Sequence, residues 1–496
     1  MGLVITARHR NTALLVAGCF FMEMLDGTIV TTATPQIGKS LHAPPVSVGL
    51  VVTAYLLTLA VLIPLSGWLT RRFGNRAIFL TAIVVFTLAS VGCASSVNLG
   101  MLVGMRVIQG AGGAMMVPVG RNMVISMADK RDLLKITSYV VWPGLIAPVI
   151  APLAGGLITT YATWHWMFLI NVPLGIVAFA FATRLIENLP GTGVTAPLDW
   201  LGVLLTCAGL GGLTYAAHLV SVPGSGGLAE GAFGIGSLIL LFLAIWHLRR
   251  TPHPLLNLRT LRVHTFRITQ QGGTLYYMVC GAMPFLLPLE FQTQFGWSPV
   301  KSGAVTLFIF VGNVGIKPAT TPLINRFGFR TFLIASTAGT VTVVALLALI
   351  TAGTPIPLIA LLAMAQGVFR STGMTTYSTV GFADTPPEDV RDASTLLATS
   401  QQMATGLSVA VATVLLRIGG GTGRAAYITA FLLLAAIATG PAIEALRMRR
   451  DAGDAARRRS SAGAGPGTPD PAPAVRAGGM AQAGGGDTDG GGAQGE

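Results

Sequence analysis

The feature that most constrains this chain is a series of long apolar runs that recurs along almost its whole length. A helix of about 20 apolar residues spans the hydrocarbon core of a bilayer, where helices and closed barrels alone satisfy their backbone hydrogen bonds. The expected fold class is therefore an all-α polytopic membrane protein. The runs predict fourteen spans, at residues 12–34, 46–70, 77–95, 99–120, 136–160, 166–186, 200–220, 231–248, 267–290, 302–322, 331–352, 355–379, 393–416 and 425–446.

Composition supports this reading. Only 10% of the residues are charged, whereas a soluble domain carries about 25%. The first run is not expected to be a cleaved signal peptide, because it contains two acids and thirteen further spans follow it.

The net charge of +13 is distributed as in a membrane protein and does not indicate a nucleic-acid partner. With a cytoplasmic N-terminus, 21 Lys and Arg residues fall at inner positions and four, Lys39, Lys301, Arg417 and Arg424, fall outside. Cytoplasmic loops of membrane proteins carry such an excess of basic residues. The chain is therefore expected in the plasma or inner membrane, with the lipid bilayer as a partner and both termini cytoplasmic.

An internal repeat divides the chain. "GWLTRRFGNR" (67–76) follows the second span, and "TPLINRFGFR" (321–330) follows the tenth with five identical positions. A second echo pairs "IQG" (108–110) with "AQG" (365–367) at nearly the same offset. Repeated halves are typical of secondary transporters, which hold their substrate near the bilayer midplane between the halves.

The repeat predicts four segments. Residues 1–190 form an N-terminal six-helix half, and residues 191–262 contain two inserted transmembrane helices and a basic cytoplasmic loop. Residues 263–450 form the C-terminal six-helix half. Residues 451–496, rich in Gly, Ala, Pro and Ser, are expected to be a disordered cytoplasmic tail because they cannot bury enough apolar surface to fold.

Five motifs resemble those of the major facilitator superfamily. "GWLTRRFGNR" is similar to the loop motif between its second and third helices. "LDGTIVTTATP" (25–35) and "RVIQGAGGA" (106–114) resemble the first- and fourth-helix motifs of its fourteen-helix drug:proton antiporter family. "PGLIAPVIAPLAGG" (143–156) resembles the fifth-helix antiporter motif and "WHWMFLINVPLG" (164–175) the sixth-helix entry. The resemblance implies two six-helix halves plus two inserted helices, and multidrug efflux driven by a proton gradient without another cofactor.

The resemblance also implies that the motif residues control the conformational cycle. In the fifth span, Gly and Pro recur at four- and three-residue spacing and form one stripe on which helices can approach closely. Two positions depart from the motifs: Arg71 replaces an acid, and Ala147 replaces a glycine. The conformational residues are Gly67, Arg72, Gly74, Arg76, Gln109, Gly110, Gly144, Pro148, Pro152, Gly155 and Gly156.

The first span carries two carboxylates, Glu23 and Asp26, at membrane depth. Asp26 lies roughly 21 Å above the inner end of its helix, and Arg106 in the fourth span lies roughly 20 Å above the same face. We therefore expect Asp26 and Arg106 to meet, with Glu23 about 4.5 Å lower on the same helical face. A carboxylate between a cation and an apolar surrounding can bind a proton or a cationic substrate, which predicts proton coupling at these three residues. A static ion pair that fixes helix packing is the alternative.

Several other polar residues at membrane depth are candidates for a substrate cavity. For Lys317 and Arg370, snorkelling to the inner surface explains the depth equally well. For the four amides, helix–helix hydrogen bonds are the alternative. The cavity candidates are Glu23, Asn171, Asn313, Lys317, Arg370, Gln401 and Gln402.

The sequence contains no recognisable catalytic or metal-binding constellation. "ATPQIGKS" (33–40) has Ala33 where a phosphate-binding loop requires glycine. We therefore expect a monomeric exporter, not an enzyme, that moves small amphipathic or cationic compounds such as drugs by proton antiport and alternating access. Three cations at membrane depth leave an exporter of a specific organic anion or metabolite as the alternative. A channel or a membrane-embedded enzyme would need a polar pore stripe or a catalytic cluster.

Overall fold

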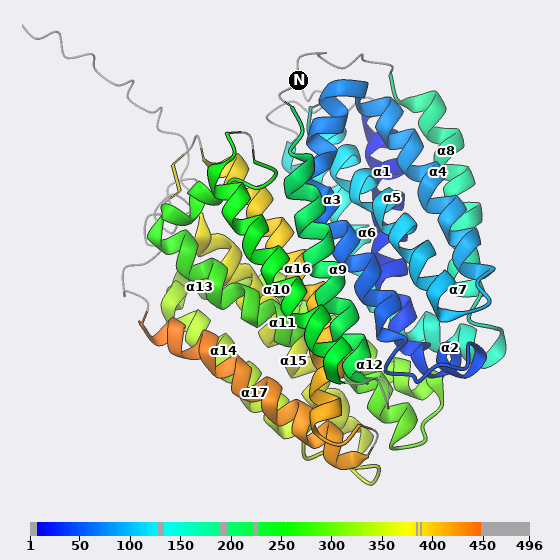
Figure 1. The fold of residues 1–496 in the computed structure, drawn as a ribbon, viewed down its shortest axis with the longest axis vertical. Helices are drawn as coiled ribbons and strands as arrows, with labels where there is room; N and C mark the ends of the chain where they lie inside the picture. Colours follow the sequence, from blue (N-terminus) through cyan, green and yellow to red (C-terminus); the bar gives the residue numbers. More distant parts are fainter. Residues whose placement is uncertain are drawn as a thin grey trace, which may run out of the picture. The chain divides into compact units, whose positions relative to one another are not determined.

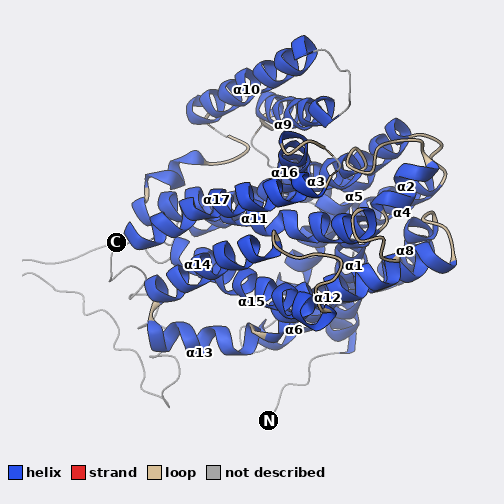
Figure 2. Cartoon of the chain, turned by 90° about the horizontal axis from the view of Figure 1, so that it is seen from below, coloured by secondary structure: helices blue, strands red, loops and turns tan. Residues whose placement is uncertain are grey.

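The computed structural model describes residues 7–126, 133–187, 197–221, 227–252, 254–382, 385–386, 389–421 and 423–447. Within these ranges the chain is helical, without strands (Figure 2). The predicted tail at 451–496 lies outside the described residues. The helices are α1 (Ala7–Ile29), η1 (Val30–Thr32), α2 (Thr34–Ser40), α3 (Gly49–Phe73), α4 (Asn75–Ala94), α5 (Leu99–Ser126), α6 (Leu133–Tyr161), α7 (Trp166–Leu169), α8 (Asn171–Leu185), α9 (Trp200–Ser221), α10 (Gly227–Arg250), η2 (Leu258–Arg262), α11 (His264–Thr293), α12 (Pro299–Gly315), α13 (Lys317–Phe327), α14 (Phe329–Leu347), α15 (Ile356–Gly381), α16 (Val390–Ile418) and α17 (Arg424–Arg447).

In the described part of the chain, fourteen helical segments are long and apolar enough to cross a membrane, which confirms the predicted polytopic α-helical class. Most spans are single helices, but the sixth comprises α7 and α8, and the tenth is broken between α12 and α13. The break falls at Ile316 because Pro318, in the first turn of α13, has no N–H to continue the helical ladder.

The spans pack as two bundles. In the first, α1 packs on α6 and α5 packs on α3 and α4, whereas in the second, α12 packs on α15 and α14 on α15 and α17. The bundles meet where α6 packs on α12 and α3 on α16. The hairpin of α9 and α10 lies beside α3 and α16, with α10 outermost (Figures 1 and 2). We call the end of the bundles where α1 begins the termini end, and the opposite end the α2 end (Figure 1).

The two repeated loops have the same backbone conformation. Gly74, between α3 and α4, has φ 83°, and Gly328, between α13 and α14, has φ 79°, a region that favours glycine. Arg76 then donates a hydrogen bond of 2.9 Å to a carbonyl near the end of α8, and Arg330 donates one of 2.6 Å to a carbonyl near the end of α17. Each half thus ties the start of its third span to the end of its sixth through an equivalent arginine.

A buried acid fastens the inserted hairpin at the termini end. Asp199, just before α9, accepts hydrogen bonds from His247 Nε2 at 2.7 Å and from the backbone N–H groups of Gly202 at 2.8 Å and Leu255 at 3.1 Å. Burial raises the pKa of the Asp199 carboxyl, but these hydrogen bonds outweigh burial and leave the pKa below its ordinary value. The carboxylate therefore joins α9, α10 and the loop that follows.

Asp199→Asn is expected to lower the thermal unfolding midpoint of the purified protein, because hydrogen bonds to a charged group contribute about 1.5–3 kcal/mol. A depressed pKa means that the contribution is present above the unfolded-state pKa of about 3.9 and is lost as the pH falls through the folded-state value. The difference in thermal unfolding midpoint between the wild type and Asp199→Asn should therefore become smaller at acidic pH. Identical midpoints at neutral pH would contradict the role of Asp199 as a fastener.

Candidate functional site

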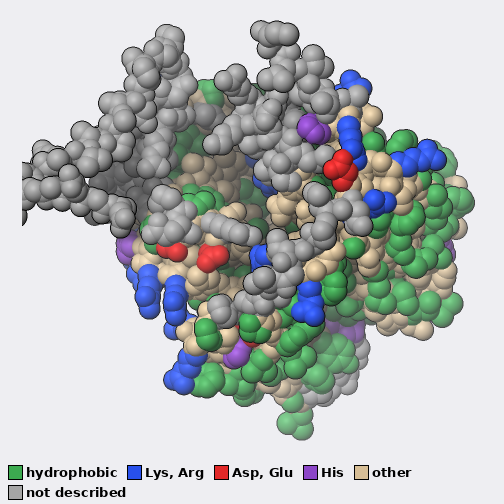
Figure 3. Space-filling view, turned by 90° about the horizontal axis from the view of Figure 1, so that it is seen from above, with side chains coloured by type: hydrophobic (Ala, Val, Ile, Leu, Met, Phe, Trp, Pro, Cys, Tyr) green, Lys and Arg blue, Asp and Glu red, His purple; other side chains and the backbone are tan. Residues whose placement is uncertain are grey.

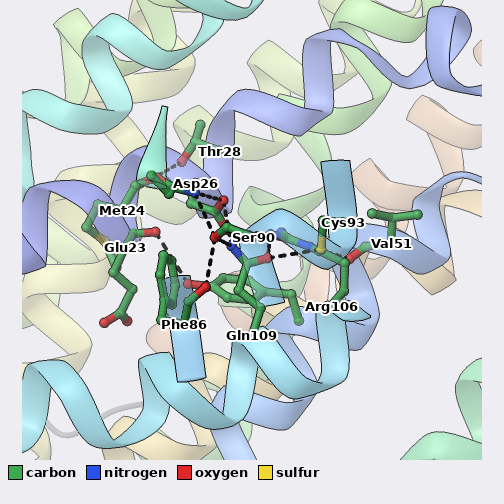
Figure 4. Close-up of polar contacts among 12 residues, drawn as sticks. Glu23, Met24, Asp26, Thr28, Val51, Phe86, Ser90, Cys93, Arg106 and Gln109 are labelled. Carbon is green, nitrogen blue, oxygen red and sulfur yellow. Dashed lines mark hydrogen bonds and ion pairs between the residues drawn. The ribbon is translucent and has the colours of Figure 1, made fainter. Parts of the chain in front are cut away.

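Asp26 lies at the centre of a buried polar network inside the N-terminal half (Figure 4). Its Oδ2 forms an ion pair with Arg106 Nη1, and neither side chain is exposed. Its Oδ1 accepts hydrogen bonds from Gln109 Nε2 at 3.0 Å and from Asn171 Nδ2 at 2.7 Å. The contact predicted from the equal depth of Asp26 and Arg106 is present. Residues of α1, α5 and α8 together hold the carboxylate.

Arg106 is held on several sides. Its Nε donates to the carbonyl of Val51 at 3.2 Å, and its Nη1 donates to Gln109 Oε1 at 2.8 Å. The guanidinium carbon lies 4.1 Å from the ring centroid of Tyr55, a cation–π contact. These contacts offset much of the cost of removing a guanidinium from water. One donor, Nη2, is buried without a hydrogen-bond partner among the described residues, so the guanidinium can still donate one further hydrogen bond.

Three members of this site, Ser90, Tyr55 and Cys93, were not predicted, and Cys93 donates from Sγ to Gln109 Oε1 at 3.5 Å. Ser90 of α4 accepts a hydrogen bond from Gln109 Nε2 at 2.8 Å, and the ring of Tyr55 contacts the Arg106 guanidinium and also lines the central cavity. A serine in an apolar span gives little signal, because its hydroxyl can bond its own helix, and Ser90 does donate to the carbonyl of Phe86. Tyr55 was detectable as the single tyrosine within the apolar second span.

Glu23 belongs to a different environment from Asp26, although both lie on α1. Figure 4 shows its carboxylate turned away from the network and joined to no dashed line. The Glu23 side chain lines the central cavity, and its Oε2 is buried without a hydrogen-bond partner in the described part of the chain. The two acids therefore differ sharply in how firmly they are held.

The central cavity has a volume of about 260 Å³ and lies between the two halves. Its walls come from α1, η1, α3 and α6 on one side and from α11, α12, α15 and α16 on the other. A mainly apolar wall with a few placed polar groups suits small organic molecules. The polar side chains that line it are Glu23, Thr28, Thr31, Tyr55, Tyr277, Arg370, Gln401, Gln402 and Thr405.

The C-terminal half contributes a cation and two amides to this cavity. Gln401 donates from Nε2 to the hydroxyl of Tyr277 at 2.6 Å, and Gln402 also lines the cavity. The guanidinium carbon of Arg370 lies 5.7 Å from the Phe310 ring centroid, and its Nε and Nη1 are buried without hydrogen-bond partners in the part of the chain that the structure describes. The structure thus places Arg370 in the cavity wall. Its depth in the span had also allowed the alternative, in which the side chain snorkels to the inner surface.

Three other cavity candidates lie elsewhere. Asn171 joins the Asp26 network. Asn313 does not line the cavity, and its backbone nitrogen faces Gly367, where α12 meets α15. Lys317 also does not line the cavity, and it donates from Nζ to Thr375 Oγ1 at 3.1 Å, beside the break between α12 and α13. Sequence depth alone did not separate these positions from the cavity wall, because depth does not define which face of a helix a residue occupies.

The motif glycines of α5 and α6 lie at close helix contacts, and Pro148 lines the cavity. A Cβ at Gly110 would lie 2.9 Å from the carbonyl oxygen of Tyr55, at the contact of α5 with α3. A Cβ at Gly144 would lie 2.2 Å from the Phe20 ring, and one at Gly155 would lie 2.8 Å from a carbonyl of α1. These positions therefore hold α3, α5 and α6 against their neighbours, as small residues do in membrane bundles.

At the α2 end, α6 touches the opposite half. A Cβ at Gly156 would lie 2.5 Å from the carbonyl oxygen of Pro299, and a Cβ at Gly303 would lie 2.1 Å from that of Pro152. Nearby, Gln292 of α11 donates to the η1 backbone at 2.8 Å and accepts a hydrogen bond from α2 at 2.9 Å. The halves are thus in close contact at this end of the central cavity.

Gly156→Leu is expected to weaken this closure, because the new side chain would meet the α12 backbone at contact distance. A cysteine placed at Gln36 should then react several-fold faster with an impermeant thiol reagent than it does in the unaltered background. Gly104→Leu is the matched control, since a Cβ at Gly104 meets nothing within 4 Å. Equal labelling rates in all three backgrounds would contradict the closure.

Two helical bundles around a shared cavity, with a buried acid–arginine pair in one of them, define a multi-pass membrane transporter. The model of the Major Facilitator Superfamily matches residues 16–246 and 272–476. The chain belongs to this superfamily and is a transporter, not an enzyme.

Two relatives, both with the provisional designation multidrug resistance protein MdtD, are similar over most of the chain. The protein from Cronobacter sakazakii is 36% identical over 449 residues, which cover 88% of this chain and 94% of the relative. The one from Pectobacterium atrosepticum is 38% identical over 407 residues, which cover 82% and 86%.

Solved structures of transporters share the fold. The POT family transporter PepTSo superposes with a TM-score of 0.63 at 15% identity, covering 92% of this chain and 99% of its own. The nucleoside transporter NupG superposes with a TM-score of 0.60 at 14% identity, covering 88% and 98%. At these identities the likeness concerns the fold alone.

Proposed function

We propose that the protein is a proton-coupled antiporter that exports small amphipathic, often cationic, compounds by alternating access. The observation that carries this proposal is the separation of two acids on one helix. Asp26 is fixed by Arg106, Gln109 and Asn171, whereas the Glu23 carboxylate lines the cavity with an unpartnered oxygen.

The coupling follows from the cost of an isolated charge. A buried carboxylate without a partner is stabilised either by a proton or by a cationic ligand, and the two exclude each other. A lipophilic cation that enters the central cavity displaces the proton from Glu23, and a proton that returns releases the cation. The same charge competition gives export its direction when the proton gradient points inward.

Asp26 has a second part in this proposal. A proton that binds the Asp26 carboxylate removes its negative charge, and the ion pair with Arg106 is lost. The Arg106 guanidinium then donates hydrogen bonds to other acceptors in the network. Tyr55, which contacts Arg106 and also lines the cavity, is the route by which that change reaches the substrate. Proton binding at Asp26 thus changes the packing of α1 against α5 and α3.

The substrate class is supported by the cavity and by the relatives. Aromatic walls such as Tyr55, Phe285 and Phe310 favour lipophilic cations, and the names of the MdtD relatives refer to multidrug resistance. Arg370 favours the second candidate, an exporter of an organic anion, since its guanidinium is also unpartnered in the cavity wall.

The remaining elements of the proposal are location and energy source. The protein lies in the plasma or inner membrane with its termini end facing the cytoplasm, an orientation that the basic excess predicted for inner positions supports. The protein works as a monomer and uses the proton gradient in place of a bound cofactor. We find no group of His, Cys, Asp and Glu that could hold a metal ion among the described residues.

The test is substrate-induced proton release from purified protein in weakly buffered detergent solution, read with a pH indicator. Tetraphenylphosphonium, a lipophilic cation, is expected to release protons from the wild type and fewer from Glu23→Gln. A lipophilic sulfonate of similar size is expected to release none. Release by the sulfonate alone would favour the anion exporter, and release by neither compound would contradict proton antiport.

A further inference from the structure

A second hollow, of about 1050 Å³, lies away from the central cavity, between the inserted hairpin and the C-terminal half. Its walls come from α9 and α10, from the segment through η2, and from α11 and α16. The part beside the spans is apolar and includes Leu210, Leu241, Ile245, Leu275 and Leu407. Ile245 and Leu275 are exposed in the structure, so this wall is open to the lipid that surrounds the spans.

The opposite part of the same hollow is basic. Arg249 lies at the end of α10, Arg259 and Arg262 lie on η2, and Arg267 lies in the first turns of α11. All four arginines are exposed. Because α10 ends and α11 begins here, the arginines lie at the membrane surface. Figure 3 views this termini end and shows many more exposed Lys and Arg side chains than acids.

Acids of the described residues do not neutralise these positive charges by ion pairs. Among the described residues, no ion pair involves any of the four arginines. Two acids lie close by, but each is already engaged: Asp199 accepts from His247, and Asp392 accepts from Asn257 Nδ2 at 2.7 Å. The hollow therefore combines a row of free guanidinium groups at the surface with an apolar wall at membrane depth.

We propose that this hollow is a binding site for an anionic phospholipid. Guanidinium groups bind phosphate oxygens in pairs, and basic residues at the membrane surface attract anionic headgroups. The acyl chains would cover the apolar wall between α9, α10 and α11, which a free phosphate ion would leave bare. The lipid would then join the inserted hairpin, whose α10 packs mainly on α9 and also on η2, to the C-terminal half.

The position of the four arginines in the wall of the hollow distinguishes this site from the general excess of basic residues at the termini end. Arg184 and Arg250 are also exposed and lie at the ends of α8 and α10, but neither lines the hollow. Arg250 instead stacks over the Trp246 ring, 4.3 Å from its centroid. A double substitution of Arg184 and Arg250 removes two positive charges from the termini end, as many as a double substitution of Arg259 and Arg262. It leaves the walls of the hollow unchanged.

The experiment is native mass spectrometry of the purified full chain, titrated with phosphatidylglycerol or with phosphatidylcholine of the same acyl length. The wild type and R184Q/R250Q are expected to retain phosphatidylglycerol in preference to phosphatidylcholine. Each surface arginine strengthens headgroup binding by about fivefold, so R259Q/R262Q should bind phosphatidylglycerol about 30-fold more weakly. A dihexanoyl phosphatidylglycerol should bind far more weakly than the long-chain lipid, because it leaves most of the apolar wall uncovered.

Three outcomes would overturn the proposal. They are equal retention of the two long-chain lipids by the wild type, an equal loss of phosphatidylglycerol in both double variants, and full displacement of the lipid by millimolar inorganic phosphate. The last would identify a simple anion site. Thermal unfolding of each variant, measured without added lipid, verifies that R259Q/R262Q is folded before its binding is compared.

Discussion

Asp26→Asn is expected to reduce pH-gradient-driven transport in proteoliposomes to the level of empty vesicles. The substitution keeps the size of the side chain but removes the negative charge that pairs with Arg106. An asparagine at this position cannot bind and release a proton. The network around Arg106 therefore stays in the arrangement that it has when position 26 is uncharged. Transport of a pre-loaded substrate down its own gradient should be impaired less than transport driven by protons.

A loss of transport in Asp26→Asn alone does not separate coupling from stability. Leaving Arg106 buried without its partner costs about 3–5 kcal/mol, so the single variant is also expected to unfold at a lower temperature. The double variant Asp26→Asn/Arg106→Gln removes both charges and should recover much of the lost stability. If the pair merely fixes helix packing, the double variant regains transport. Coupling requires that it regain stability and remain inactive, and normal proton-driven export by either variant would refute the role of Asp26.

The sequence predicted the fold well because the bilayer limits what an apolar run can become. Length and hydropathy were sufficient to locate fourteen spans, and the repeated "RFG" loops pointed to equivalent positions where Gly74 and Gly328 share a positive φ. The break at Ile316 was not predicted, although Pro318 carried its signal. Prolines are tolerated in membrane helices, so Pro318 alone did not show whether the helix would break or only bend.

The candidate site was predicted less completely. Depth along a helix correctly brought Asp26 to Arg106, because the rise per residue is fixed. Depth could not give rotation about the helix axis, so Glu23 was assigned both to proton coupling beside Asp26 and to the cavity wall, and the structure places its side chain in the cavity wall and Asp26 in the buried network. Asn171 was expected in the cavity and instead binds Asp26. Which face of a span meets the cavity depends on how neighbouring helices pack, and that information is not contained in any single span.

The charge of the substrate is decided by a pair of substitutions in the cavity, Glu23→Gln and Arg370→Gln. Both side chains line the cavity, they come from opposite halves, and each has buried polar atoms without partners. If Glu23 binds a cationic substrate, its charge contributes about 1–2 kcal/mol in a partly hydrated cavity. Glu23→Gln should then weaken the apparent affinity for monovalent lipophilic cations about 5- to 30-fold.

The same panel of compounds gives the opposite pattern for an anion exporter. Arg370→Gln would then weaken the binding of organic anions, and Glu23→Gln would leave it unchanged or improve it slightly, because a repulsive charge is removed. Neutral analogues of matched size serve as the control, since neither substitution changes the apolar wall that binds them. For the proposed cation exporter, Arg370→Gln should spare cations. Equal losses for cationic, neutral and anionic compounds in Glu23→Gln would show that this carboxylate serves proton transfer or packing and does not read substrate charge.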